Sequence, residues 1–418
     1  MFSLRQVLEL RNLGRTLNAN TSPMRDWMRA TLGFALVCSF VNIANANEIP
    51  PPACNQQFRN LLRQGTTSLT VENDLFAKSD RQYTSGIKIG LVTPDIPVEE
   101  REKCLNKWAL GFNKFLLQFA NTEKAPITLS LTLVGQDMYT PEYRYTNELI
   151  KKDRPYAGWL YMGYGVNARV DEEHSSVSKL HSVELQIGVV GPAARGKEAQ
   201  DFIHRIIDAE YFQGWNNQLK NEPAFLYHYE FKYKPQAVFP ITAFGPEWGW
   251  SMIHHGGVSL GTVSSYVNAG SAIRFGRNIP DDFGTSPIRP GGNNSAPHAV
   301  PPGAENRDAV PQGKRLGRKG FSAHLYLSLD ARVVANNIFL DGNTFRSSHS
   351  VGPRRLVADA AFGAVMIGKC WKLAAGRVVR TKEFDLQPHV QKYGSITVSF
   401  EDGYFDSLLG IGARCNGA

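Results

Sequence analysis

The sequence has little apolar continuity and lacks the common short metal-binding motifs. Its one long apolar run, residues 30–44 of 418, is too short to cross a bilayer as a helix. Charged residues make up 20% of the chain and the mean hydropathy is −0.28, which excludes a helical membrane protein. No H-E-x-x-H or paired-cysteine metal motif occurs. The length still allows two ordinary domains or one large β-barrel.

Residues 30–44 have the features of a secretory signal peptide. Arg25 and Arg29 precede the run, and an A-x-A site at 44–46 follows it. We therefore interpret 1–46 as leader and signal peptide, with a buried helix as the alternative. Its removal takes away five Arg and two acidic residues and reduces the formal net charge from +8 to about +5. Such a mild excess suits a surface that faces anionic lipid headgroups.

What the sequence has in abundance is alternation with a period of two. In 225–233 five aromatic side chains alternate with polar ones, and 323–333, 182–189 and 159–168 follow the same pattern. A soluble sandwich also alternates, but these segments have the length that crosses a bilayer at a tilt. Aromatic residues also lie near the expected strand ends, as in an interfacial girdle. They are Trp108, Tyr139, Tyr156, Trp159, Trp248, Trp250 and Tyr266.

The pattern therefore predicts an all-β fold, a twelve-stranded antiparallel transmembrane β-barrel within residues 47–400. The expected strands lie near 66–76, 83–93, 127–139, 156–168, 181–191, 222–234, 241–253, 262–275, 320–335, 354–368, 371–383 and 392–400. With a periplasmic N-terminus, the extracellular loops are 77–82, 140–155, 192–221, 254–261, 336–353 and 384–391. Residues 277–319, rich in Pro, Gly and Asn, are expected to form a flexible loop, and 401–418 a C-terminal tail.

Cysteine is scarce, and one of the five cysteines leaves with the signal peptide. The remaining four, Cys54, Cys104, Cys370 and Cys415, predict disulfides in an exported protein, and three pairings are open. The expected topology places Cys54 and Cys104 around the first hairpin, and Cys370 in a turn near the tail. It therefore favours the pairs Cys54–Cys104 and Cys370–Cys415.

One extracellular loop has a helical period instead. In 196–211 apolar residues recur at i, i+3, i+4, i+7 and i+8 from Ala199, which predicts a short amphipathic helix in that loop. Gln200 and His204, one turn apart, lie along the edge of the apolar stripe. Glu210 lies at the helix end and can join His204 only if the helix unwinds there. An ordinary structural histidine at a helix boundary is the alternative interpretation.

The topology brings this helix to the same rim as the first hairpin. Asn73 and Asp74 end the first strand, and Thr84 opens the second. A histidine base, carboxylates for a hard cation and nearby amides form a constellation for metal-assisted ester hydrolysis with an activated water. Alternation places Asn73 on the lipid-facing side with Leu69 and Val71, exposed at the rim, and Asp74 inward beside Thr84. A shared face would require a bulge.

Several longer segments carry a resemblance. They are "ENDLFAKSDRQYTSG" (72–86), "GQDMYTP" (135–141), "DRPYAGWLYMGYG" (153–165), "GVVGPAARGKEAQDFIHRIIDAEYFQGWNNQLKNEP" (188–223), "NIPDDFG" (278–284) and "FLDGNTFRSSHSV" (339–351). Together, and in this order, they resemble the outer-membrane lipid A 3′-O-deacylase family. The resemblance implies a twelve-stranded barrel in the cell outer membrane. It also implies calcium-dependent hydrolysis of the 3′-linked acyloxyacyl ester of lipid A, the membrane anchor of lipopolysaccharide, in the outer leaflet.

The resemblance also implies roles for single residues. The family's catalytic positions fall on Asn73, Asp74, Gln200 and His204, where His204 would activate water. Calcium would be held by groups including Asp74, Thr84 and Glu210 and would stabilise the oxyanion.

Two features depart from the family pattern. The active-site lysine has no clean counterpart, since its position falls near Thr146. Lys151 and Lys152 are the nearest candidates for substrate binding, together with Thr84. The barrel's expected terminal aromatic residue, Phe400, is followed by eighteen further residues.

Two other functions remain open on sequence grounds. A non-enzymatic barrel, either a pore or a surface-binding protein, is one, and a phospholipase that acts on other outer-leaflet lipids is the second. Inward-facing charges could neutralise one another and fill a narrow barrel, which argues against a pore. They are Glu184, Glu230, Lys232, Asp330 and Arg332. We expect a monomer whose partners are lipid A and the membrane, with no nucleic-acid partner.

Overall fold

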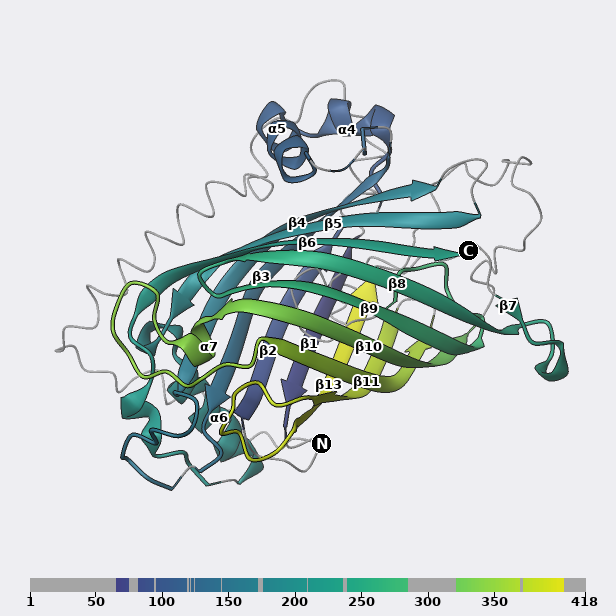
Figure 1. The fold of residues 1–418 in the computed structure, drawn as a ribbon. Helices are drawn as coiled ribbons and strands as arrows, with labels where there is room; N and C mark the ends of the chain where they lie inside the picture. The colour runs from purple at the N-terminus through teal and green to yellow at the C-terminus, as the bar shows by residue number, and fades with distance from the viewer. Residues whose placement is uncertain are drawn as a thin grey trace, which may run out of the picture. The chain divides into compact units, whose positions relative to one another are not determined.

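The computed structural model describes residues 65–74 and 82–401, except 94, 119, 121, 124, 144, 172–175, 209, 236–238, 285–320 and 369–370. In this part of the chain twelve long strands form one closed antiparallel barrel, as predicted (Figure 1). Each strand pairs with its neighbours in sequence, β1 pairs with β13, and β6 pairs with β8 to complete the ring. The short β7 adds to the edge of β8.

The strand bounds follow the predicted ones closely, with one exception described below. They are β1 (Thr66–Asn73), β2 (Gln82–Val92), β3 (Ile127–Thr140), β4 (Ala157–Asp171), β5 (Val177–Val190), β6 (Glu222–Pro235), β7 (Phe239–Pro240), β8 (Trp248–Gly261), β9 (Ser264–Arg277), β10 (Ser322–Asn337), β11 (Leu356–Ile367), β12 (Trp371–Arg380) and β13 (Gln391–Glu401).

Helices lie at both ends of the barrel. The α6 end carries α6 (Gly196–Ile207) and α7 (Ile338–Asp341), together with the 3-10 turns η3 (Pro192–Ala194) and η4 (Gly214–Asn217). The opposite end, where β1 begins and β13 ends, is called the termini end. It carries α4 (Val98–Cys104), α5 (Lys107–Leu116) and η5 (Thr242–Phe244). In the described residues, no helix has both the length and the apolar sequence needed to cross a bilayer.

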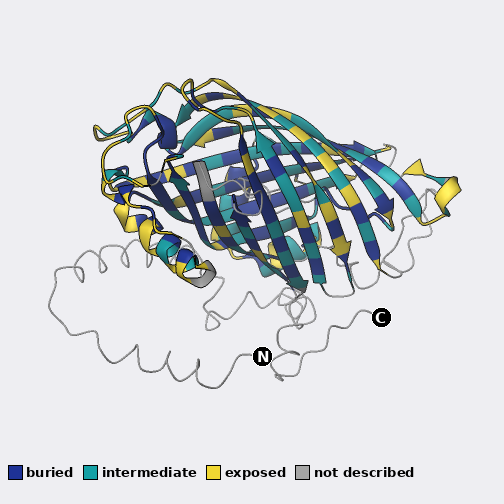
Figure 2. Ribbon diagram, turned by 90° about the horizontal axis from the view of Figure 1, so that it is seen from below, coloured by how far each residue is buried: buried dark blue, intermediate teal, exposed yellow. Residues whose placement is uncertain are grey.

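The strands present an apolar outer face and a polar inner face. In β10, Leu325, Leu327 and Leu329 are 51–59% exposed on the outside, whereas His324 is 5% exposed. Figure 2 shows the same alternation of buried and exposed residues along many strands. In lipid the backbone groups must be satisfied by other strands, so a closed ring with apolar residues outside is the stable arrangement.

The predicted seventh strand and the loop after it were wrong. Residues 254–261, predicted as a loop, continue β8, and the chain turns at 262–263 instead. Gly257 is needed in this strand, because a Cβ there would lie 2.7 Å from the Tyr229 carbonyl oxygen and 2.9 Å from Asn268 Oδ1. The glycine therefore marks a close approach between strands rather than a turn.

A segment between two of the predicted strands also folds. Residues 98–116 form α4 and α5, so Trp108 lies on a helix and not at a strand end. Cys104, at the end of α4, is disulfide-bonded. Cys54, Cys370 and Cys415 lie outside the described residues, as do 1–46 and 402–418. Of the predicted loop 277–319, residues 278–284 are ordered, with Ile279, Asp282 and Phe283 buried.

Loops close over the barrel at the α6 end through one buried ion pair. Arg154 Nη2 lies 2.6 Å from Glu383 Oε2, and Arg154 also stacks over the rings of Tyr139 and Phe384. Burial alone raises the pKa of Glu383, but the charges of Arg154 and Arg380 outweigh it and hold the pKa below its ordinary value. The pair therefore joins the loop before β4 to the loop before β13.

We expect Gly257→Ala to destabilise the barrel by about 1–3 kcal/mol, because the added methyl group meets backbone that cannot move freely. Gly256→Ala is the matched control, since its Cβ would have 3.6 Å to the nearest atom. Urea unfolding of both refolded variants measures the difference. Equal midpoints for the two would show that the close approach at Gly257 has no energetic weight.

We expect Arg154→Met to cost about 3 kcal/mol, since it leaves the Glu383 carboxylate buried without the guanidinium group of Arg154. Because the folded pKa of Glu383 is lowered, its contribution is present above the ordinary glutamate pKa of about 4.3 and is lost as the pH falls through the lowered value. Unfolding midpoints across this range should fall steeply in acid for the parent protein. Arg277→Met breaks the exposed Arg277–Glu247 pair and should change the midpoint little.

Candidate functional site

Helix α6 lies against the outer wall of the barrel, across β3 and β4. It begins where glycines allow close approach, since a Cβ on Gly158 would lie 3.2 Å from the Cα of Gly196. The helix then passes over Met138, which clusters with Ala199 and Ile203. The helix therefore runs from β4 across β3, in the direction of β2 and β1. Its end is sharp, because Asp208 adopts a left-handed conformation with φ of 54°.

This helix end fixes the orientation of His204. The helix stops four residues earlier than predicted, and the returning chain brings the carbonyl of Glu210 to 2.6 Å from His204 Nδ1. A carbonyl oxygen can only accept, so Nδ1 carries the proton and donates it. In the neutral ring Nε2 is then left with its lone pair, as a general base requires. The ring is 3% exposed and packs edge-on against Phe212 at 5.3 Å.

Gln200 lies one turn before His204 and is also held by a single partner. Trp215 Nε1 donates to Gln200 Oε1 at 2.6 Å, and both side chains are almost fully buried. Trp215 in turn packs against Tyr156 at 5.2 Å. Within the described part of the chain, the Gln200 amide nitrogen has no hydrogen-bond partner. It is thus a buried donor that can serve an oxygen of a bound molecule.

Asn73, the last residue of β1, lies on the register row that runs under α6. Asn73 pairs with Ser85, Ser85 with Met138, and Met138 with Gly158 under α6. Cross-strand partners share a face, so Asn73 is on the outer face, as predicted. Contrary to the prediction, it is not exposed at the rim. Asn73, Ser85 and Met138 are each less than a tenth exposed. This corner of the outer wall is covered, unlike the lipid-facing wall.

Asp74 follows Asn73 directly and is fully buried. The pairing of β1 with β2 runs without a shift through Asn73, so the bulge that would bring both onto one face is absent there. A shift occurs instead in the pairing of β2 with β3, between Tyr83 and Ser85. Thr84 lies within it, in β2, and its side chain is outside what the structure describes.

The remaining predicted residues, Glu210, Lys151 and Lys152, have exposed side chains. The Glu210 side chain is exposed, and the group that meets His204 is its carbonyl. Lys151 and Lys152 are exposed in a turn of the loop before β4. That loop ends on Tyr156, which packs against Trp215 and so adjoins the helix.

The donors at the end of β1 fit a hard cation in chemistry. Asp74 supplies a buried carboxylate and Asn73 an amide oxygen beside it, the ligand types that calcium prefers. Among the described residues, no group of three His, Cys, Asp or Glu side chains could hold a metal. A calcium ion would therefore draw on amide, hydroxyl or backbone oxygens as well as Asp74.

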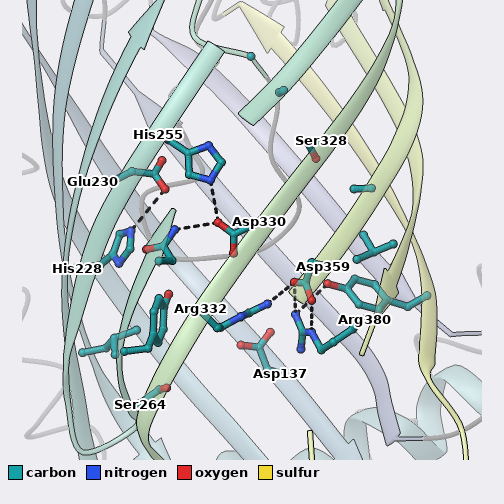
Figure 3. Close-up of a pocket in the computed structure, with 18 of the residues that line it drawn as sticks. Asp137, His228, Glu230, His255, Ser264, Ser328, Asp330, Arg332, Asp359 and Arg380 are labelled. Atoms are coloured by element: carbon teal, nitrogen blue, oxygen red, sulfur yellow. Dashed lines mark hydrogen bonds and ion pairs between the residues drawn. The ribbon is translucent and has the colours of Figure 1, made fainter. Parts of the chain in front are cut away.

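The barrel interior contains a separate cavity of about 170 Å³. Figure 3 shows charged side chains converging there, with His255 and Asp330 at 2.8 Å and a bidentate Arg380–Asp359 pair at 2.8 and 3.0 Å. The inward charges predicted from sequence are all paired. Further pairs are Lys88–Glu184, Lys232–Glu230 and Arg332–Asp359. These pairs crowd the lumen, whereas Asn73 and helix α6, which carries Gln200 and His204, lie on the outer wall.

Sequence reasoning missed the residues that hold the helix in place. Trp215, Phe212 and Tyr156 form a cluster with Met138 around the base of α6. Trp215 and Phe212 lie outside any periodic segment, so no hydrophobic pattern indicates them, and Tyr156 was assigned to the interfacial girdle. The tautomer of His204 was equally hidden, because it depends on where the chain goes after the helix.

The profile of a known family, described as "Outer membrane protein LpxR", matches residues 32–401. LpxR from Salmonella typhimurium matches the barrel with a TM-score of 0.58 at 19% identity, over 80% of this chain and 99% of that chain. The β-domain of the Bordetella autotransporter BrkA matches with a TM-score of 0.37 at 9% identity, over 81% and 98% of the two chains. No curated protein sequence matches at a significant level. Because the profile covers most of the chain, the chain belongs to the LpxR family of outer-membrane lipid A 3′-O-deacylases, as its motifs had indicated.

Proposed function

We propose that this outer-membrane deacylase hydrolyses the 3′-linked acyloxyacyl ester of lipid A in the outer leaflet, with calcium bound and with His204 as the general base. The observation that carries the proposal is the hydrogen bond from His204 Nδ1 to the Glu210 carbonyl, which leaves Nε2 able to accept a proton. The buried amide nitrogen of Gln200, one turn away, supports it as a donor to the developing oxyanion.

The reaction follows from these two groups. His204 Nε2 accepts a proton from water, and the water oxygen bonds to the acyl carbon of the ester. The amide nitrogen of Gln200 donates to the carbonyl oxygen while it carries negative charge. The bond between the acyl carbon and the 3′-oxygen of the sugar then breaks, and His204 returns the proton to the leaving 3′-oxygen. The products are a free acyloxy fatty acid and lipid A with a 3′-hydroxyl group.

Asp74 would hold calcium, with Asn73 and Thr84 beside it. Calcium bound there would supply positive charge that stabilises the oxyanion. Glu210, by contrast, serves the site through its carbonyl. Lys151 and Lys152 extend from the adjoining loop, where they would bind the phosphate groups of lipid A.

The position of the site supports a lipid substrate. The row from Asn73 to Gly158 lies on the outer face, the side of the barrel that lipid molecules contact. A pore is less well supported, because charge pairs crowd the lumen. A phospholipase would use the same groups, so the substrate itself must be tested.

We expect His204→Ala to lower deacylation at least about 100-fold, because the base is removed, while the barrel still folds. Mass spectrometry of lipid A from cells that express each form measures the loss of the 3′-linked chain. Phe202→Ala, at an exposed position on the same helix, is the control and should stay active. Unchanged lipid A with the folded parent protein and calcium present would sink the proposal. Loss of acyl chains from phospholipids instead would indicate the phospholipase.

We expect Trp215→Phe to lower activity by about tenfold to 100-fold, since Gln200 loses the donor that orients it and small misplacements are costly. The buried Gln200 oxygen would also be left unsatisfied, at a stability cost of about 1–3 kcal/mol. Deacylation rates and urea midpoints of the same preparations separate the two effects. Full activity in the variant would show that Gln200 needs no such orientation.

A further inference from the structure

The helix pair α4–α5 packs on the outer wall of the barrel. Val166, Ala168 and Val183 point outward from β4 and β5, yet each is completely buried in the cluster that the helix pair completes. Two side chains of the wall also bind α5 directly. Tyr164 donates its hydroxyl hydrogen to Asn113 Oδ1 at 2.6 Å, and Tyr227 donates to the Leu116 carbonyl at 3.3 Å. Figure 1 shows the pair beside β4 and β5, away from α6.

The strand register gives the level of α5 along the barrel. Tyr164 lies opposite Leu131, and Leu131 lies opposite Leu91, next to the last residue of β2. Tyr227 belongs to the same row through Leu185. The helix therefore lies where the shorter strands end, on the side of the termini.

The wall immediately toward the α6 end is exposed and apolar. Leu133, Ile187 and Phe225, each two residues from that row, are 42–48% exposed. This surface continues the lipid-facing wall of an outer-membrane barrel. Over the sector that α4 and α5 cover, the wall itself is buried, so the outer surface of the helices takes its place.

The outer surface of α5 is aromatic with a basic edge. Trp108 is 75% exposed and Phe115 is 59% exposed. Seven residues apart, they lie about 20° from each other around the helix axis. Lys107 and Lys114 adjoin them about 100° away, and α5 has no acidic residue, although Lys114 lies 3.7 Å from Glu123. Aromatic rings beside lysines are typical of helices that lie in a membrane interface.

We propose that α5 is an interfacial helix, whose Trp108 and Phe115 insert into the phospholipid leaflet at the termini end of the barrel. Lys107 and Lys114 reach the headgroups by extending their long side chains. The occupant of this surface is phospholipid because the surface continues a wall that contacts lipid, at the level where the lipid belt ends. This site lies at the opposite end from α6 and is independent of catalysis.

The test places the photoreactive amino acid benzoyl-phenylalanine at position 108 or 115 of the full-length protein. The folded barrel is reconstituted in vesicles of phosphatidylethanolamine and phosphatidylglycerol and then irradiated. Phe362, exposed on the strand wall, gives the reference for lipid labelling, and Glu102, exposed on α4, is the matched control. We expect phospholipid adducts at positions 108 and 115, as at position 362, and no phospholipid adduct at position 102.

A second measurement tests the proposal if a variant with benzoyl-phenylalanine fails to fold. The tryptophan emission of the parent protein minus that of Trp108→Phe gives the contribution of Trp108. We expect that contribution to shift to shorter wavelength in vesicles and to be quenched by phospholipid brominated in its acyl chains. Lipid labelling at 362 but not at 108 or 115 would overturn the proposal, as would cross-links to a second copy or to another protein. Emission of Trp108 that stays unquenched would overturn it too.

Discussion

The backbone pairing of β6 with β8 is the interaction on which the rest of the structure depends. Eight residue pairs, from Leu226–Gly261 to Tyr233–His254, join the two ends of the sheet. A bilayer offers no water to satisfy an open edge, so this closure makes a strand protein stable in the membrane. Once the ring is closed, each outward side chain faces lipid unless another part of the chain covers it.

That constraint explains why the polar corner of the outer wall is covered. On the outer face of β1 and β2, Leu69 and Ile87 face lipid. Asn73 and Ser85 point outward on the same two strands, yet these two polar side chains are buried. Helix α6 packs on the adjoining strands, and the glycine contact between Gly158 and Gly196 lets it come close. Polar groups for chemistry can therefore lie on the lipid side of the barrel without facing hydrocarbon. The lumen, by comparison, is filled by its own charge pairs.

The sequence predicted the barrel well because the pattern that predicts a strand is also the pattern that lipid requires. Leu325, Leu327 and Leu329 alternate with polar residues for that single reason. The failures arise where a tertiary contact decides. From the sequence Gly257 resembles a turn residue, but its close approach to Tyr229 within the sheet is what requires glycine. Asn73 likewise resembles an exposed amide, but the structure covers it.

For the site, the sequence predicted that Gln200 and His204 share one edge of a helix, and it could not predict what holds them. The Trp215 donor and the Glu210 carbonyl reach these side chains from irregular segments, where no periodicity applies. The expected topology and the family resemblance both indicated the residues at the first hairpin. Their contacts with calcium and lipid A remain a proposal that the outer-wall geometry supports.

The account depends most directly on the protonation pattern of one ring. Nitrogen-15 NMR of the folded, histidine-labelled protein, with His204→Ala to assign the signal, reads which nitrogen of the neutral His204 ring carries the proton. The account predicts a proton on Nδ1, donated to the Glu210 carbonyl, and a bare Nε2. A proton on Nε2, with Nδ1 bare, would contradict it.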